Sequence, residues 1–138
     1  MNSIDYQVTA AIAALCVIGW GMAYAVRGTD IGNITMRWVF PAALSLAFAA
    51  FSLFAMRSDG PLGFWPEHID GVWGNQIFFD LLFCAGSAFF LAVPRLRAAG
   101  MRPLPWFFAI AATGGIGVLA MIARLLFLER VRARTQAL

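Results

Sequence analysis

One aspartate, Asp80, lies inside a strongly apolar stretch of the sequence, GNQIFFDLLFCAG (residues 74–86). A charged side chain at bilayer depth costs about 3 kcal/mol or more, so such residues usually pair or face the interior of a helix bundle. Helical spacing gives this stretch one small, polar stripe, which consists of Gln76, Asp80, Cys84 and Ser87. We expect the stripe to face other helices, where its groups would form a polar pocket.

Arg124 is the simplest partner for this carboxylate. It lies four residues before the end of the last apolar segment, at Leu128, and Asp80 lies four residues after the start of the third, at Gln76. If the two segments are antiparallel helices, both charges lie at a similar depth, and the sequence predicts an Asp80–Arg124 ion pair. The alternatives are a protonated Asp80, an Arg124 that extends to the headgroups, and a proton- or cation-handling role for Asp80.

The remaining chemistry-bearing residues are few. His68 is the only histidine and lies in a loop, PEHID, beside Glu67 and Asp70. A solvated acidic loop explains this cluster better than a metal site, and two axial histidines for a haem are absent from the chain. No metal site and no catalytic residue are predicted.

Cysteine and lysine exclude further classes of enzyme. Cys16 and Cys84 lie in apolar segments without a CxxC pair, which argues against a dithiol oxidoreductase. All ten basic residues are arginine, so a lysine Schiff base is excluded.

The composition is that of an integral membrane protein. Of 138 residues, 62% are hydrophobic and 12% are charged, against roughly a quarter charged in ordinary soluble domains. The sequence pI near 9.5 comes from arginines beside apolar segments, where they anchor and orient helices. No basic patch is interleaved with exposed aromatic residues, so nucleic-acid binding is excluded. We expect an integral protein of a bacterial inner membrane.

Four apolar segments define the predicted fold. Each approaches the roughly 20 residues that a helix needs to cross a bilayer. They run over residues 8–26, 38–56, 76–93 and 104–128. The fold class predicted is all-α: one domain over residues 1–138, a bundle of four transmembrane helices arranged up-down-up-down.

This topology groups the connections on two sides. The N-terminus, the 57–75 loop and the C-terminal tail would share one side, and the connections at 27–37 and 94–103 the other. The arginines divide evenly, with Arg57, Arg124, Arg130, Arg132 and Arg134 on the first side and Arg27, Arg37, Arg95, Arg97 and Arg102 on the second. Because Arg27 follows the first segment and no basic residue precedes it, the N-terminus is expected outside.

Glycines in two segments predict close helix packing. Gly114, Gly115 and Gly117 lie in the fourth segment and Gly86 in the third. Glycine lets helix backbones approach closely within membranes. The alternative is a groove that admits a lipid tail, a quinone or a pigment; no resident cofactor is predicted.

Three short pieces of the second half resemble an uncharacterised family of small bacterial membrane proteins, classed as a domain of unknown function. They are FFDLL (78–82), GMR (100–102) and LLFLER (125–130), and the likeness covers residues 75–130. The chain departs from the family in its extra first helix and its long middle loop. The resemblance implies a helical membrane protein with an aspartate on the penultimate helix, and it carries no known activity.

Three functions fit these observations. The first is a non-catalytic accessory or assembly subunit that packs against a larger membrane complex of the respiratory or photosynthetic type, with membrane lipids and that complex, or a second copy of the chain, as partners. The second is a binder or carrier of an apolar small molecule, lipid or ion that uses Asp80 and Gln76. The third is a membrane enzyme that acts on a lipid or isoprenoid, with Asp80 or Glu67 as its acid.

Overall fold

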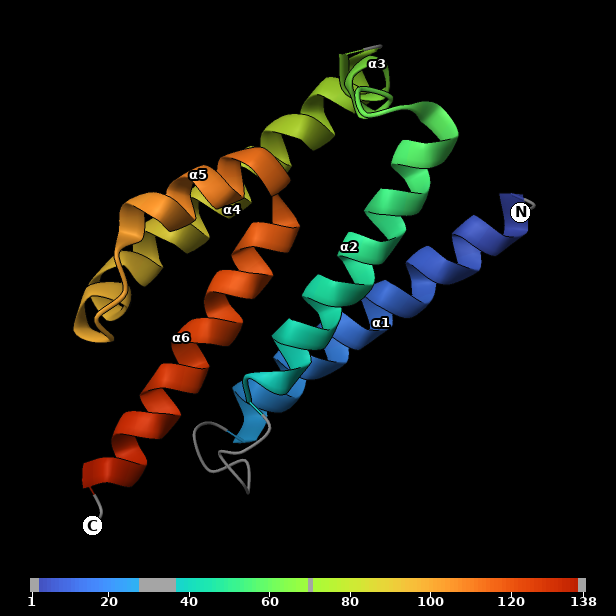
Figure 1. Cartoon of the computed structure of the whole chain (residues 1–138). Helices are drawn as coiled ribbons and strands as arrows, with labels where there is room; N and C mark the ends of the chain where they lie inside the picture. Colours follow the sequence, from blue (N-terminus) through green and yellow to red (C-terminus); the bar gives the residue numbers. More distant parts are fainter. Residues whose placement is uncertain (1–2, 28–36, 70, 137–138) are drawn as a thin grey trace. The chain divides into compact units, whose positions relative to one another are not determined.

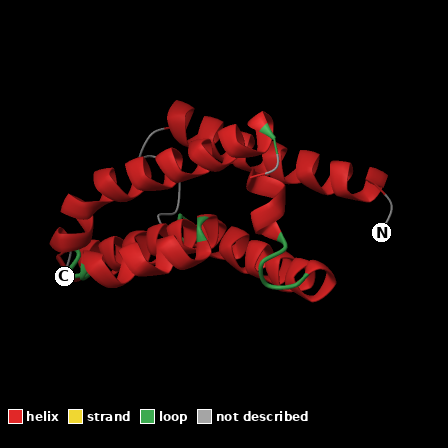
Figure 2. Cartoon of the chain, turned by 90° about the horizontal axis from the view of Figure 1, so that it is seen from above, coloured by secondary structure: helices red, strands yellow, loops and turns green. Residues whose placement is uncertain are grey.

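The computed structural model describes residues 3–27, 37–69 and 71–136, and the regular structure in these ranges is entirely α-helical (Figure 2). The all-α class is therefore confirmed. The helices are α1 (Ser3–Arg27), α2 (Val39–Asp59), α3 (Phe64–Ile69), α4 (Val72–Ala98), α5 (Pro103–Thr113) and α6 (Gly115–Gln136) (Figure 1).

The helices belong to two compact units. The first, Met1–Ile34, contains α1, whose apolar part is Ala11–Ala23. The second, Thr35–Leu138, contains the other five helices.

Within the described residues, α2 and α4 are long and apolar enough to cross a membrane. Their 21 and 27 residues correspond to about 31 and 40 Å, against a hydrocarbon core of roughly 30 Å. Only 11% of the apolar window of α2 and 6% of that of α4 are buried within the protein. A core helix of a water-soluble protein would be mostly buried, whereas most of the apolar surface of these two helices is not covered by the other helices of their unit.

The described residues of the 57–75 segment are mostly helical. The sequence predicts a loop over 57–75, but α2 continues to Asp59, α3 occupies Phe64–Ile69 and α4 begins at Val72. Gly60 and Gly71, with φ of 83° and 92°, end α2 and precede α4. The ring of Trp65 meets that of Phe78 edge-on, with centroids 6.3 Å apart. This aromatic contact packs α3 against α4, which the loop prediction did not include.

The fourth predicted span is not one helix. It breaks at Gly114 into α5 and α6, so the prediction of a continuous helix over 104–128 was wrong. Gly114 has φ 57° and ψ −124°, a backbone conformation that L side chains rarely adopt, and its N–H donates to the carbonyl of Ile110 at 2.7 Å. The break therefore depends on a residue without a side chain, in the ATGGIG stretch interpreted above as packing surface.

Replacing Gly114 by alanine should lower the free energy of unfolding by about 1–3 kcal/mol, because a methyl group strains this backbone conformation. Gly86→Ala is the matched control, since a Cβ there meets nothing within 4 Å. Unfolding in detergent measures both variants. Equal stability of Gly114→Ala and the parent would show that the break does not need the positive φ.

After the break, α6 runs back alongside the other helices of its unit (Figure 1). Arg95 of α4 bonds Glu129 of α6, and Arg132 bonds the carbonyl oxygen of Ala98. Both pairs are 34 residues apart, so α4 and α6 run in the same direction at a constant offset.

The contacts of α2 agree with this direction. Ser45 donates a hydrogen bond to the carbonyl of Ile116 at 3.0 Å, and the rings of Trp38 and Phe127 lie 5.4 Å apart. Trp38, just before α2, thus contacts a later residue of α6 than Ser45 does, so these two helices are antiparallel. The sequence predicts the C-terminal tail on the same side as the 57–75 loop; the break at Gly114 instead returns α6 to the end where α4 finishes.

A small core lies at that end of the second unit. It consists of Leu96, Ala99, Met101, Ile110, Met121 and Leu125. These residues come from the end of α4, the turn that follows it, α5 and α6. Positive φ at Gly100 (71°) allows the tight turn between α4 and α5. The core therefore fixes the α5–α6 hairpin against the last turns of α4.

Candidate functional site

The polar stripe of α4 faces outward. Gln76, Asp80, Cys84 and Ser87 are all exposed, so the other helices of the second unit do not cover them. The half-buried aromatic residue of this region is Phe78, whose ring packs on Trp65. An aromatic contact with α3, rather than the polar stripe, therefore sets the rotation of α4 here.

Asp80 has one hydrogen-bond neighbour among the described residues. The thiol of Cys84, one turn further along α4, donates to its Oδ1 at 4.0 Å. A thiol is a weak donor and carries no positive charge. The carboxylate of Asp80 is thus left without an ionic partner in the part of the chain that the structure describes.

The structure does not bring Asp80 and Arg124 together. With the 34-residue offset, Arg124 is level with Phe90, ten residues after Asp80 and about 15 Å away along the axis of α4. The prediction assumed one unbroken, antiparallel fourth helix. Because the chain turns back at Gly114, α6 is parallel to α4 and the two charges lie at different depths.

We therefore expect no energetic coupling between these two residues. The effects of Asp80→Asn and Arg124→Gln on the free energy of unfolding should add in the double variant to within about 0.5 kcal/mol, as for separated sites. A double-mutant cycle in detergent measures this. A double variant more stable than the sum by 1 kcal/mol or more would restore the predicted pair.

An unpredicted ion pair does join α4 to α6. Arg95 donates from Nε to Oε1 of Glu129 at 3.0 Å and from one terminal nitrogen to Oε2 at 2.8 Å. This is the two-bond geometry that arginine and a carboxylate favour. The side chains are 55% and 38% exposed, so the pair sits at the surface. The sequence contains one indication of this ion pair. Glu129 is the only acidic residue after Asp80, and seven arginines lie in that part of the chain.

The C-terminal end of α4 receives a second arginine from α6. Arg132 donates to the backbone carbonyl of Ala98, in the last turn of α4. Carbonyls in the last turn lack helical partners, and a cation there also opposes the helix dipole. Arg132 thus caps α4 one turn beyond the Arg95–Glu129 pair.

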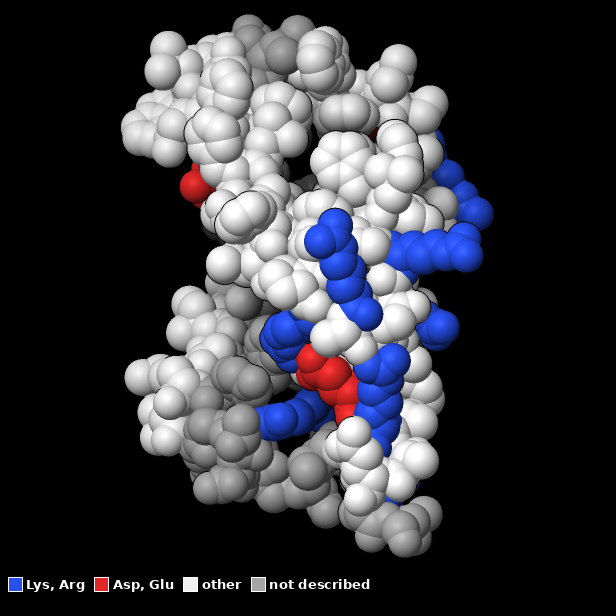
Figure 3. All heavy atoms as spheres, turned by 90° about the vertical axis from the view of Figure 1, so that its left-hand side faces the viewer, with Lys and Arg blue, Asp and Glu red and all other residues white. Residues whose placement is uncertain are grey.

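Arginines gather at this end of the second unit. Figure 3 shows arginine side chains surrounding a small acidic patch on one face. Of the nine arginines in this unit, Arg57 lies at the opposite end of α2. The other eight, on the half that holds the Arg95–Glu129 pair, are Arg37, Arg95, Arg97, Arg102, Arg124, Arg130, Arg132 and Arg134. The equal number of arginines predicted for the two sides of the membrane is therefore not found in the second unit, because α6 returns to the arginine-rich end.

The four predicted packing glycines have different environments. Gly117 is buried, and a Cβ there would lie 2.8 Å from Oγ1 of Thr113 and 2.9 Å from the carbonyl oxygen of Ala109. A Cβ on Gly115 would lie 3.3 Å from the ring of Phe48, and Gly114 forms the break. Gly86 faces open space. Gly117 alone among them is held close to backbone atoms of the neighbouring helix, α5.

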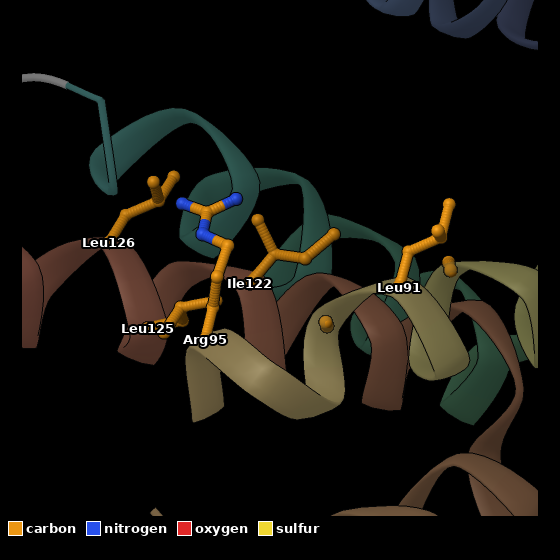
Figure 4. A pocket seen from close by; sticks show the side chains of 7 residues that line it. Leu91, Arg95, Ile122, Leu125 and Leu126 are labelled. Atoms are coloured by element: carbon orange, nitrogen blue, oxygen red, sulfur yellow. The ribbon is translucent and has the colours of Figure 1, made fainter. Parts of the chain in front are cut away.

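A groove lies between α4 and α6 beside the ion pair. Its volume is about 180 Å³. Figure 4 shows its lining, which is Ala88, Leu91, Ala92 and Arg95 of α4 and Ile122, Leu125 and Leu126 of α6. All of these are apolar except Arg95, and Asp80 is not among them.

The described residues contain no group of three or more His, Cys, Asp or Glu side chains that could hold a metal ion. Cys16 and Cys84 are both free thiols and exposed. Asp70 and the side chains of Glu67 and His68 lie outside the described residues. The PEHID cluster therefore remains a sequence prediction.

Comparison with protein-family models, curated proteins and solved structures finds no match to this chain. The resemblance of residues 75–130 to a domain of unknown function stays a prediction.

Proposed function

We propose that the chain is a non-catalytic integral membrane protein that serves as an accessory or assembly subunit of a larger membrane complex. The observation that carries this proposal is the exposed polar stripe of α4. Asp80 lies on a helix apolar enough to cross a membrane, has no ionic partner among the described residues and points away from the packed core. A carboxylate in that position is unfavourable against lipid, so a polar surface of another protein covers it.

The exposed apolar surface supports the membrane location. Large apolar side chains are exposed along both span helices, among them Leu46, Leu53, Ile77, Phe83 and Phe90. A monomer in water rarely exposes a continuous apolar surface of this extent. Lipid around α2 and α4, with a partner on the Asp80 stripe, accounts for this distribution of side chains.

The helical hairpin suggests a modified bundle. In this proposal α1, α2 and α4 cross the bilayer, and α5 and α6 enter from the arginine-rich end and return to it. α5 has 11 residues, about 16 Å, which reaches about halfway through the hydrocarbon core. The arginine-rich end faces the cytoplasm of a bacterial inner membrane, following the bias of basic residues.

The alternatives draw less support from the described residues. A carrier or enzyme that uses Asp80 needs a cavity that reaches this carboxylate. The groove described above lies near Arg95 instead. Nothing in the part of the chain that the structure describes favours an enzymatic function.

Photo-crosslinking tests the partner. A photoreactive residue replaces Ser87, on the stripe, or Leu81, which is exposed on a different face of α4, and the cells are illuminated. Position 87 should give one discrete adduct with a larger protein, and position 81 none. Lipid adducts alone at both positions, a bond to α1 of the same chain, or an adduct of twice the chain's mass would each contradict the accessory-subunit proposal, and the last would indicate a homodimer.

A further inference from the structure

We propose that the groove between α4 and α6 binds an anionic phospholipid, with one acyl chain against its apolar wall and the phosphate at the arginines beside Arg95. This inference rests on the membrane location proposed above.

Two small side chains make the apolar part of the site. Ala88 and Ala92 lie one turn apart on α4, and the space left by their short side chains is bounded by Ile122 and Leu126 of α6. Because α4 and α6 run parallel at a constant offset, the two helices keep the groove aligned along their axes. A groove of about 180 Å³ is too small for a partner's helix, whose diameter with side chains is about 10–12 Å. It suits one flexible chain.

Charge identifies the headgroup. Figure 4 shows the Arg95 guanidinium beside Leu126, at one end of the groove. Glu129 holds this guanidinium through two hydrogen bonds, which fixes its position. Arg130 and Arg132 lie one and three residues after Glu129 on α6, so Arg95, Glu129, Arg130 and Arg132 together carry a net positive charge. Basic pockets between membrane helices on the cytoplasmic side favour anionic headgroups, and arginine's planar fork matches a phosphate.

The position of this site relative to the membrane is consistent with a lipid. The arginine-rich end is the end at which α4 and α6 leave the apolar region, so the groove begins near the headgroup level and extends inward. A lipid lying along α4 would place its phosphate near the arginines and its tail over Ala92 and Ala88. A free phosphate ion would contact only the arginines and would leave the apolar groove unfilled.

Lipid binding to the purified full chain in mild detergent tests the proposal. The probes are phosphatidylglycerol and phosphatidylcholine with identical acyl chains, and the readouts are retained lipid in native mass spectrometry and the shift in melting temperature. We expect phosphatidylglycerol to bind at least about tenfold more tightly, since one charge-assisted hydrogen bond corresponds to roughly that factor. Inorganic phosphate alone should give no stabilisation.

Two variants separate the apolar wall from the charge. Ala92→Leu fills the groove and should weaken phosphatidylglycerol binding about tenfold, whereas Ala43→Leu, at an exposed position of α2, should not. The double variant Arg95→Gln/Glu129→Gln removes the pair without leaving a single unpaired charge. It should lower the preference for the anionic lipid about tenfold, because the guanidinium at the end of the groove is lost while Arg130 and Arg132 remain. Arg57→Gln, at the opposite end, should preserve it.

Several results would overturn the site. These are equal binding of the two lipids, equal loss of binding in Arg57→Gln and in the double variant, full binding by Ala92→Leu, or stabilisation by inorganic phosphate as large as that by phosphatidylglycerol. If the double variant does not fold, the effect of Ala92→Leu on phosphatidylglycerol binding still tests the site. Failure of the lipid site alone leaves the chain dependent on detergent, whereas failure of the proposed membrane location would leave it soluble and monodisperse without detergent.

Discussion

Gly117→Leu is expected to disrupt the α5–α6 hairpin and to lower the free energy of unfolding by about 3 kcal/mol or more. A Cβ at this position would lie 2.8 Å from the hydroxyl of Thr113 and 2.9 Å from both the carbonyl oxygen of Ala109 and the Cα of Ile110. Two of these three atoms belong to the backbone, which cannot move aside as a flexible side chain does. Overpacking a tight contact typically costs 1–3 kcal/mol, and backbone displacement adds to it.

The effect should reach the rest of the core. α6 supplies Met121 and Leu125, both almost fully buried, so a displaced α6 would also open the packing around Leu96 of α4. Denaturant or thermal unfolding in detergent measures the loss. Gly86→Leu, whose Cβ would meet nothing within 4 Å, is the matched control and should remain within about 0.5 kcal/mol of the parent. Similar stability of the two variants would mean that α5 and α6 are not held this closely.

The second large effect concerns the side of the membrane on which the end of α6 lies. The parallel direction of α4 and α6 puts residue 135 at the arginine-rich end, opposite the connection that contains residue 62. Four full crossings, as predicted from sequence, would put both residues on one side. A thiol reagent that does not cross membranes distinguishes the two arrangements.

In a background with Cys16→Ser and Cys84→Ser, we expect Leu62→Cys to react in intact cells. Thr135→Cys should react only after the cells are permeabilised, because the arginine-rich end faces the cytoplasm. The expected contrast is nearly all-or-none. Reaction at both positions in intact cells would contradict the hairpin and restore the fourth crossing; reaction at position 135 alone would keep the hairpin and reverse the orientation.

Contacts between residues far apart in the sequence were not predicted correctly. Residue spacing correctly grouped Gln76, Asp80, Cys84 and Ser87 on one stripe, since spacing within a helix is local. It could not show that the stripe faces outward, because the contact between Phe78 and Trp65 that orients this part of α4 involves a segment expected to be a loop. The Arg95–Glu129 pair was missed because the two residues were assigned to opposite sides.

The all-α class and the apolar character could be predicted from sequence, since these depend on residue types and on local periodicity. The boundaries of α2 and α4 were close for the same reason. The direction of α6 was decided only by tertiary structure: a single glycine in a positive-φ conformation reverses the chain, and neither hydropathy nor helix propensity distinguishes such a reversal from a continuous helix. That reversal separates Asp80 from Arg124, joins Arg95 to Glu129 and collects the arginines at one end.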